Sequence, residues 1–287
     1  MWKRRIVETE QGAFEIFECG QGEPLAVTHL YSEFDERGNA LAHPFTPYYH
    51  VFLINVRGAG NSVKASDPQE YRMDYTVADL EAIRRALGFE KWAFAGHSTG
   101  GMLALKYATL APGSLTKVIA GGAAASYEYA AHPDCMYHHQ NKNFARITEI
   151  MDALNDPATP VEVRQALSYE WALMSYYSEE KLKAALKKPN SGRTIGERLD
   201  FFRKVDYRDY DVREELKHVQ LPCFIYAGRH DAQCPVQFGI EIAELLPNAQ
   251  LTIFEESNHF PFLEEEEAFQ GFVTSTIDSL SESISLK

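Results

Sequence analysis

The sequence FAGHSTGG, residues 94–101, joins a predicted strand to a predicted helix. Within it, Gly96, Ser98 and Gly100 satisfy the pattern Gly-x-Ser-x-Gly. A serine on so tight a strand-to-helix turn adopts a strained backbone, which flanking glycines permit because they carry no Cβ. Such a turn would lift the Ser98 hydroxyl above the edge of a sheet and point the N-terminus of the next helix at it. The motif therefore predicts a serine nucleophile.

Short apolar runs alternate with helical patterns on both sides of this turn, which is typical of a parallel sheet with right-handed crossovers. The predicted strands cover 24–28, 51–56, 91–95, 115–120, 221–227 and 250–254, and the predicted helices cover 76–87, 102–110, 236–246 and 265–280. A hairpin over 4–9 and 14–19 precedes them. Thr76 and Asp79 would form a capping box, and the acidic run 264–267 an acidic first helical turn. The expected class is α/β, a mostly parallel sheet flanked by helices.

A segment without strands interrupts the alternation after Gly121-Gly122. From there to about residue 205 the pattern is helical. Acidic and basic residues are equally numerous in it, so the net charge of −13 belongs to the rest of the chain. We therefore expect a core of residues 1–121 and 206–287 that carries a helical cap insertion of residues 122–205.

Composition restricts the partners and the compartment. The chain has 28 Lys+Arg against 41 Asp+Glu, which disfavours nucleic acid and anionic membrane surfaces. No apolar run reaches the ~18–20 residues of a membrane span, and no apolar stretch near the N-terminus suggests a signal peptide. Four cysteines are spaced neither as a disulfide framework nor as a zinc site. We expect a cytoplasmic protein with a small-molecule or short-peptide substrate; its oligomeric state is not indicated.

The motif and its placement resemble the α/β-hydrolase superfamily over nearly the whole chain. That family orders its catalytic residues as nucleophile, acid and histidine. Asp231, just after the predicted strand 221–227, looks like the family acid, and His259, after the strand 250–254, matches the family histidine. The resemblance implies that His259 takes the Ser98 proton and returns it to the leaving group. Asp231 would fix the tautomer of the imidazole.

An oxyanion hole needs hydrogen-bond donors, which the family takes from two backbone N–H groups. One comes from the residue after the nucleophile, here Thr99. The other comes from a loop after the first parallel strand, where the family usually has His-Gly followed by the donor. This chain has His29-Leu30-Tyr31-Ser32, which by position makes Tyr31 the donor and Leu30 the alternative. The phenol of Tyr31 would line the pocket or pack against its neighbours.

Two further features look structural. The segment 55–62, Asn-Val-Arg-Gly-Ala-Gly-Asn-Ser, resembles a family loop that begins with Asp, and we interpret it as a loop in which Arg57 anchors neighbouring backbone. His97 precedes the nucleophile, and the alternation of a strand points its side chain away from Ser98.

The segment Tyr169-Glu170-Trp171 is the candidate substrate-binding part of the insertion. Proline iminopeptidases resemble this chain in layout and place cap carboxylates where the free amine of the substrate binds. Glu170 between Tyr169 and Trp171 is similar to their Trp-Glu cap segment. Their Gly-Gly-Pro-Gly loop is absent here and replaced by residues 30–33. Packing between cap and sheet would equally explain the aromatic residues, and a solvent-facing position would explain Glu170.

These features together predict a serine hydrolase that cleaves a small ester or lactone through an acyl-enzyme. Ser98 in the nucleophile position excludes the aspartate nucleophile of dehalogenases and most epoxide hydrolases. The first alternative is a proline iminopeptidase-like aminopeptidase that removes an N-terminal residue. The second, of another class, is a non-catalytic ligand-binding protein with a hydrolase fold. A triad and an oxyanion hole would supply the chemistry, so neither cofactor nor metal is implied.

Overall fold

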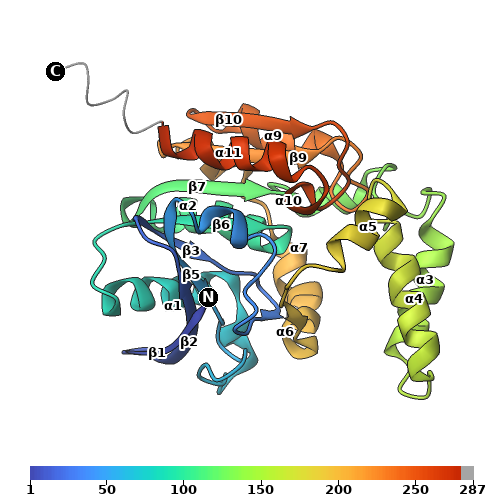
Figure 1. Ribbon diagram of the computed structural model, residues 1–287, viewed down its shortest axis with the longest axis horizontal. Coiled ribbons are helices and arrows are strands. Elements are labelled where there is room, and N and C mark those ends of the chain that lie inside the picture. The colour runs from blue at the N-terminus through green and yellow to red at the C-terminus, as the bar shows by residue number, and fades with distance from the viewer. Residues whose placement is uncertain (279–287) are drawn as a thin grey trace.

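An eight-stranded sheet runs through the centre of the molecule (Figure 1). The computed structural model describes residues 1–278, of which residues 155 and 278 are described by their backbone alone. The strand order is β1-β2-β5-β3-β6-β7-β9-β10. The strands are β1 Lys3–Thr9, β2 Gly12–Cys19, β3 Glu23–Val27, β5 Tyr49–Ile54, β6 Trp92–His97, β7 Leu115–Gly121, β9 Cys223–Gly228 and β10 Ala249–Phe254. β1 and β2 form an antiparallel hairpin, β2 is also antiparallel to β5, and the remaining neighbours are parallel.

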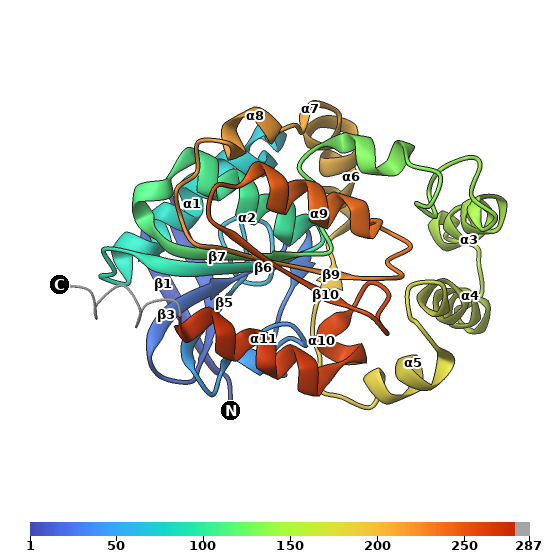
Figure 2. The ribbon, with the colours of Figure 1, turned by 90° about the horizontal axis from the view of Figure 1, so that it is seen from above.

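Helices cover both faces of this sheet (Figure 2). One face carries α1 (Met73–Ala86), α2 (Thr99–Leu110) and α9 (Val236–Leu245), and the other carries α11 (Glu266–Asp278). The central strands are buried between the two layers, which explains why their sequences are nearly continuous apolar runs. The predicted α/β class, the hairpin and the mostly parallel sheet are confirmed. Residues 279–280 of the predicted last helix lie outside the described part of the chain.

The insertion stands beside the sheet, at the end where the parallel strands finish (Figure 1). Its helices are α3 (Phe144–Asn155), α4 (Val161–Leu173) and α5 (Glu179–Ala185), and α3 packs against α4. The chain returns to the core through a two-stranded antiparallel pair of β4 (Ser32–Glu33) and β8 (Arg193–Thr194). Every helix among residues 1–278 is too short or too polar to pass through a bilayer.

The return continues in one helical run made of α6 (Gly196–Phe201), the π-helical turn η5 (Phe202–Asp206) and α7 (Tyr207–Asp209). Arg198, buried in this run, donates to the carbonyls of Leu30 and Arg57, so the run is tied to the core. Residue 205, the expected end of the insertion, lies inside it. We retain the division into a core and a cap of residues 122–205 as a proposal.

The predicted capping box of the first long helix is wrong, because α1 begins three residues earlier, at Met73. Thr76 lies inside the helix and donates to the Arg72 carbonyl. Asp79 is 2% exposed and binds the Arg57 guanidinium through both oxygens, at 2.8 and 3.0 Å. Arg57 also donates to the Gln11 carbonyl at 3.0 Å, which confirms its predicted anchoring role. Asp79 is therefore the counter-ion of a buried arginine and caps no helix.

The N-terminus of α1 is instead capped from a distant part of the chain. An oxygen of the Asp206 carboxylate accepts the Met73 N–H at 3.0 Å. Burial raises the pKa of Asp206 to about 6, although this hydrogen bond and the charge of Arg72 oppose the shift. A carboxyl whose pKa is raised on folding contributes stability below the pKa of the unfolded chain, and this stability is lost as the pH rises through the folded value.

We expect Asp206→Asn to gain stability relative to the wild type as the pH rises from 5 to 8. The asparagine oxygen can still accept the Met73 N–H, but the side chain no longer ionises. The expected relative gain is about 1–2 kcal/mol, measured by urea unfolding at both pH values. Asp209→Asn, at an exposed position on the same helical run, is the control and should show no such trend. Equal differences at pH 5 and pH 8 would contradict the prediction.

Candidate active site

Ser98 sits on the turn between β6 and α2, with φ 56° and ψ −125°. Within residues 1–278 it is the one residue other than glycine with a positive φ. Such a backbone costs roughly 1–3 kcal/mol and is kept where the surrounding structure enforces it, commonly at functional sites. A Cβ on Gly100 would lie 2.5 Å from the Thr28 carbonyl oxygen, so this glycine lets α2 approach the end of β3. The turn has the geometry that the motif predicts.

Asp231 and His259 lie together at the same edge of the sheet, in the loops after β9 and β10. His259 Nδ1 is 2.8 Å from an oxygen of Asp231, and the two residues are only 2% and 5% exposed. The other Asp231 oxygen accepts the backbone N–H groups of Gln233 and Cys234 at 2.9 and 2.8 Å. Because an ionised carboxylate only accepts hydrogen bonds, the Nδ1 of His259 carries the proton. In the neutral form of the ring, Nε2 can then accept one.

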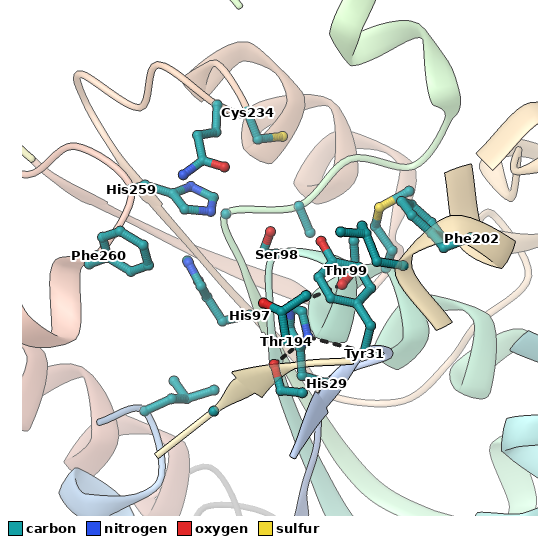
Figure 3. A pocket seen from close by; sticks show the side chains of 18 of the residues that line it. His29, Tyr31, His97, Ser98, Thr99, Thr194, Phe202, Cys234, His259 and Phe260 are labelled. Carbon is teal, nitrogen blue, oxygen red and sulfur yellow. Dashed lines mark hydrogen bonds between the residues drawn. The ribbon is translucent and has the colours of Figure 1, made fainter. Parts of the chain in front are cut away.

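Ser98 and His259 line the same cavity, which has a volume of about 910 Å³ (Figure 3). This volume suits a small organic molecule. The insertion contributes much of the wall, and aromatic side chains are frequent in it. They include Tyr129, Tyr137, Phe144, Trp171, Tyr176 and Phe202. Among the described residues, no group of three or more His, Cys, Asp or Glu side chains is arranged to hold a metal ion.

His29 joins the two loops expected to form the oxyanion hole. Its Nε2 is 2.9 Å from the Thr99 hydroxyl, and its Nδ1 is 2.9 Å from the Ser32 hydroxyl. The Tyr31 backbone N–H also donates to Nδ1, at 3.4 Å. Burial lowers the pKa of His29 to about 3, with smaller contributions from the positive charges of His259 and Arg198, so the ring is neutral. Nδ1 is then an acceptor, and Nε2 carries the proton and donates to Thr99.

The two expected oxyanion donors are differently placed. Thr99 is the first residue of α2, so its backbone N–H has no carbonyl partner within the helix and is open to a ligand. Tyr31 lines the cavity with Thr99, but its backbone N–H is directed at His29. The structure therefore brings both residues to the site and leaves only the Thr99 N–H without an intramolecular acceptor.

His97 also lines the cavity, beside the ring of His259, at a centroid distance of 4.6 Å. Burial holds the pKa of His97 well below its usual range, and the neighbouring His259 charge acts in the same direction. Gly122, with φ +55°, lies against both rings. A Cβ there would overlap the His97 ring and lie 3.1 Å from His259 Cε1. Apart from the Gly121-Gly122 pair itself, nothing in the sequence indicated that Gly122 lies against these two rings.

The loop that carries His259 is tied to the insertion. The His259 backbone N–H donates to the Ser175 carbonyl at 3.1 Å. Glu264 accepts the N–H groups of Asn258 and Phe260 at 3.0 Å each, and that of Tyr177 at 2.6 Å. Glu264 ends α10 (Pro261–Glu264), is 7% exposed, and precedes α11. The acidic run 264–267 is divided between two helices: Glu264 lies in the short α10, and Glu266 and Glu267 form the expected acidic first turn of α11. The Glu264 carboxylate has an additional use, because it accepts three backbone N–H groups.

Only one residue of the expected substrate-binding segment reaches the cavity. Trp171 lines it, whereas Tyr169 and Glu170 do not. The Glu170 carboxylate is paired with Arg146 through two contacts of 2.7 Å, and its side chain is 40% exposed. The Tyr169 hydroxyl donates to Glu179 at 3.0 Å. A solvent-facing position, one of the two interpretations of Glu170, is the one that the structure shows.

Comparisons with known proteins agree with this architecture. Residues 28–266 match the family model described as alpha/beta hydrolase fold. A solved α/β-fold family hydrolase from Bacillus anthracis is 60% identical, with a TM-score of 0.95 over 96% of this chain and 99% of that one.

Two curated relatives are more distant. A pimeloyl-[acyl-carrier protein] methyl ester esterase of Vibrio campbellii is 26% identical over 87% of this chain and 92% of its own length. A proline iminopeptidase of Saccharolobus solfataricus is 25% identical over 80% of this chain and 76% of its own length. With the matched fold and the serine turn at the end of β6, these relationships show that the chain belongs to the α/β-hydrolase family.

Proposed function

We propose that this α/β hydrolase is a serine hydrolase that cleaves a small ester or lactone through an acyl-enzyme. The observation that carries the proposal is the buried 2.8 Å contact between His259 and Asp231, on the same cavity as the strained Ser98. Nucleophile, base and orienting carboxylate are the parts that acyl transfer requires.

The proposed reaction begins with attack of Ser98 Oγ on the substrate carbonyl carbon, while His259 Nε2 accepts the hydroxyl proton. The carbonyl oxygen becomes an oxyanion, which the Thr99 N–H stabilises. As the oxyanion collapses, the bond to the leaving alkoxide breaks, and His259 returns the proton to it. Water then attacks the acyl-enzyme by the same steps and releases the acid. Asp231 stays ionised and stabilises the imidazolium in both halves.

The test is hydrolysis of p-nitrophenyl butyrate and of proline p-nitroanilide by the purified protein, with Ser98→Ala as the control. Cleavage of the ester alone, lost in the variant, is the expected result. Cleavage of the anilide that disappears in the variant would establish an aminopeptidase. If neither compound is cleaved and Ser98 does not react with a fluorophosphonate, the protein is a binding module with a hydrolase fold.

An aminopeptidase is the second candidate, because several curated relatives are named proline iminopeptidase. The structure offers little support for the amine-binding role that this function would give Glu170. Arg146 already neutralises the Glu170 carboxylate and lowers its pKa, and the carboxylate does not line the cavity. We therefore favour the ester or lactone substrate.

We expect Glu170→Gln to leave kcat/KM within about twofold of the wild type for both the ester and the proline anilide, since the side chain is exposed and outside the cavity. Glu149→Gln, which removes the other carboxylate paired with Arg146, is the matched control. A KM increase of fivefold or more for the anilide alone, seen with Glu170→Gln and not with Glu149→Gln, would assign amine binding to Glu170.

A further inference from the structure

The loop after β3 is expected to give the second donor of the oxyanion hole, and the Tyr31 N–H on this loop is already used. The Tyr31 N–H donates to His29. The Tyr31 carbonyl accepts the Ile195 N–H at 2.8 Å, and the Leu30 carbonyl accepts the Arg198 guanidinium. These contacts tie the loop to the segment that returns from the insertion. They hold the Tyr31 N–H in the direction of His29.

The Tyr31 side chain, in contrast, is directed into the site. Its ring meets the His29 ring edge-on at a centroid distance of 4.5 Å, and Phe202 lies on another side at 5.9 Å. Figure 3 shows the ring extending from its loop toward Thr99 and Ser98. Burial raises the pKa of the phenol, and the neighbouring Thr99 hydroxyl partly offsets this increase. The phenol is therefore a neutral O–H donor that lies beside the residue expected to give the first oxyanion donor.

The direction of the hydrogen bonds leaves the phenolic proton free. A backbone N–H can only donate, so His29 Nδ1 is the acceptor and its Nε2–H donates to the Thr99 oxygen. The Thr99 oxygen is thus already used as an acceptor, and among residues 1–278 the Tyr31 O–H donates no hydrogen bond to a protein group. The phenolic proton can therefore be donated to a ligand in the cavity that Tyr31 lines.

We propose that the Tyr31 hydroxyl is the second donor of the oxyanion hole and acts together with the Thr99 backbone N–H. The proposal rests on the serine-hydrolase function proposed above. When Ser98 attacks, the carbonyl π-electrons move to the oxygen, and the Tyr31 O–H donates a hydrogen bond to the resulting oxyanion. No proton is transferred from the phenol, and the bond is released when the oxyanion collapses. Tyr31 is then a catalytic residue through its side chain.

Tyr31→Phe tests this directly, because it removes the hydroxyl and keeps both the ring and the backbone N–H. We expect kcat for p-nitrophenyl butyrate to fall about 10²–10³-fold, as for the loss of one oxyanion donor elsewhere, with KM nearly unchanged. An aryl trifluoromethyl ketone, whose adduct with Ser98 carries the oxyanion, should bind more weakly by a similar factor. A general loss of structure would instead change KM as well and lower the melting temperature.

Tyr48→Phe is the matched control. It removes the hydroxyl of a tyrosine that is 41% exposed and lies outside the cavity. Its kcat should stay within threefold of the wild type. If Tyr31→Phe also stays within threefold while a fluorophosphonate labels Ser98 in both proteins, the inference is wrong and backbone donors suffice. If the wild type neither turns over the ester nor reacts with the fluorophosphonate, the proposed function fails, and the inference with it.

Discussion

Replacing Ser98 with alanine is expected to lower kcat for p-nitrophenyl butyrate by about 10⁴–10⁶-fold, the effect known for loss of a serine nucleophile. The variant keeps the Cβ, and so it keeps the same strained turn with φ 56°. Its stability should therefore stay within about 0.5 kcal/mol of the wild type. A loss of activity of this size in a folded variant would identify the hydroxyl oxygen of Ser98 as the nucleophile.

The measurement combines turnover with labelling by a fluorophosphonate, which forms a bond to an activated serine. The wild type should incorporate one equivalent and Ser98→Ala none. Ser66→Ala is the control, since Ser66 bonds to Glu70 outside the cavity. Activity in Ser98→Ala within tenfold of the wild type would show that another group is the nucleophile and would overturn the proposed mechanism.

The fold was predictable because its signals are local. Each parallel strand is a short apolar run between turn residues, and each amphipathic helix repeats its apolar positions within the same few residues. Ser98, Asp231 and His259 could be selected for the same reason. Each follows the end of a parallel strand, and the carboxyl ends of such strands meet at one edge of the sheet. Their catalytic roles stay predictions that the variants here would test.

The contacts that the sequence did not reveal join residues far apart in the chain. Asp79 has the spacing of a capping residue, but it pairs with Arg57, and the cap of α1 comes from Asp206. Glu264 lies in a helical turn as its spacing suggests, but its carboxylate also binds the Tyr177 N–H of the insertion, which the spacing does not indicate. Such choices depend on which charged group is buried beside which partner, and local spacing carries no information on that.

The orientation of the loop after β3 was equally inaccessible. Position in the family motif predicts Tyr31, with Leu30 as the alternative, as an oxyanion residue, but it cannot say which atoms of Tyr31 are available to a ligand. In the structure the neutral His29 accepts the Tyr31 N–H. The same reasoning applies to Glu170, whose carboxylate pairs with Arg146 and lies outside the cavity. The direction of a side chain depends on its tertiary contacts, and a short sequence motif does not specify those contacts.

The second large effect is expected at Asp231, where asparagine should lower kcat by about 10⁴-fold. One carboxylate oxygen accepts the Gln233 and Cys234 N–H groups, and the other accepts His259 Nδ1–H. The NH₂ group of an asparagine cannot take the first position, where it would face two N–H donors. It must therefore face His259.

An amide NH₂ in that position donates to His259 Nδ1, which holds the ring in the tautomer with its proton on Nε2. That nitrogen can then no longer accept the Ser98 proton, although the geometry of the site is unchanged. The kcat of Asp231→Asn for p-nitrophenyl butyrate and its rate of fluorophosphonate labelling should fall together, because both need the same base. Asp200→Asn, an exposed change, should alter neither rate. A decrease of less than tenfold in Asp231→Asn would mean that Asp231 does not set the tautomer of His259, and that another group orients the base.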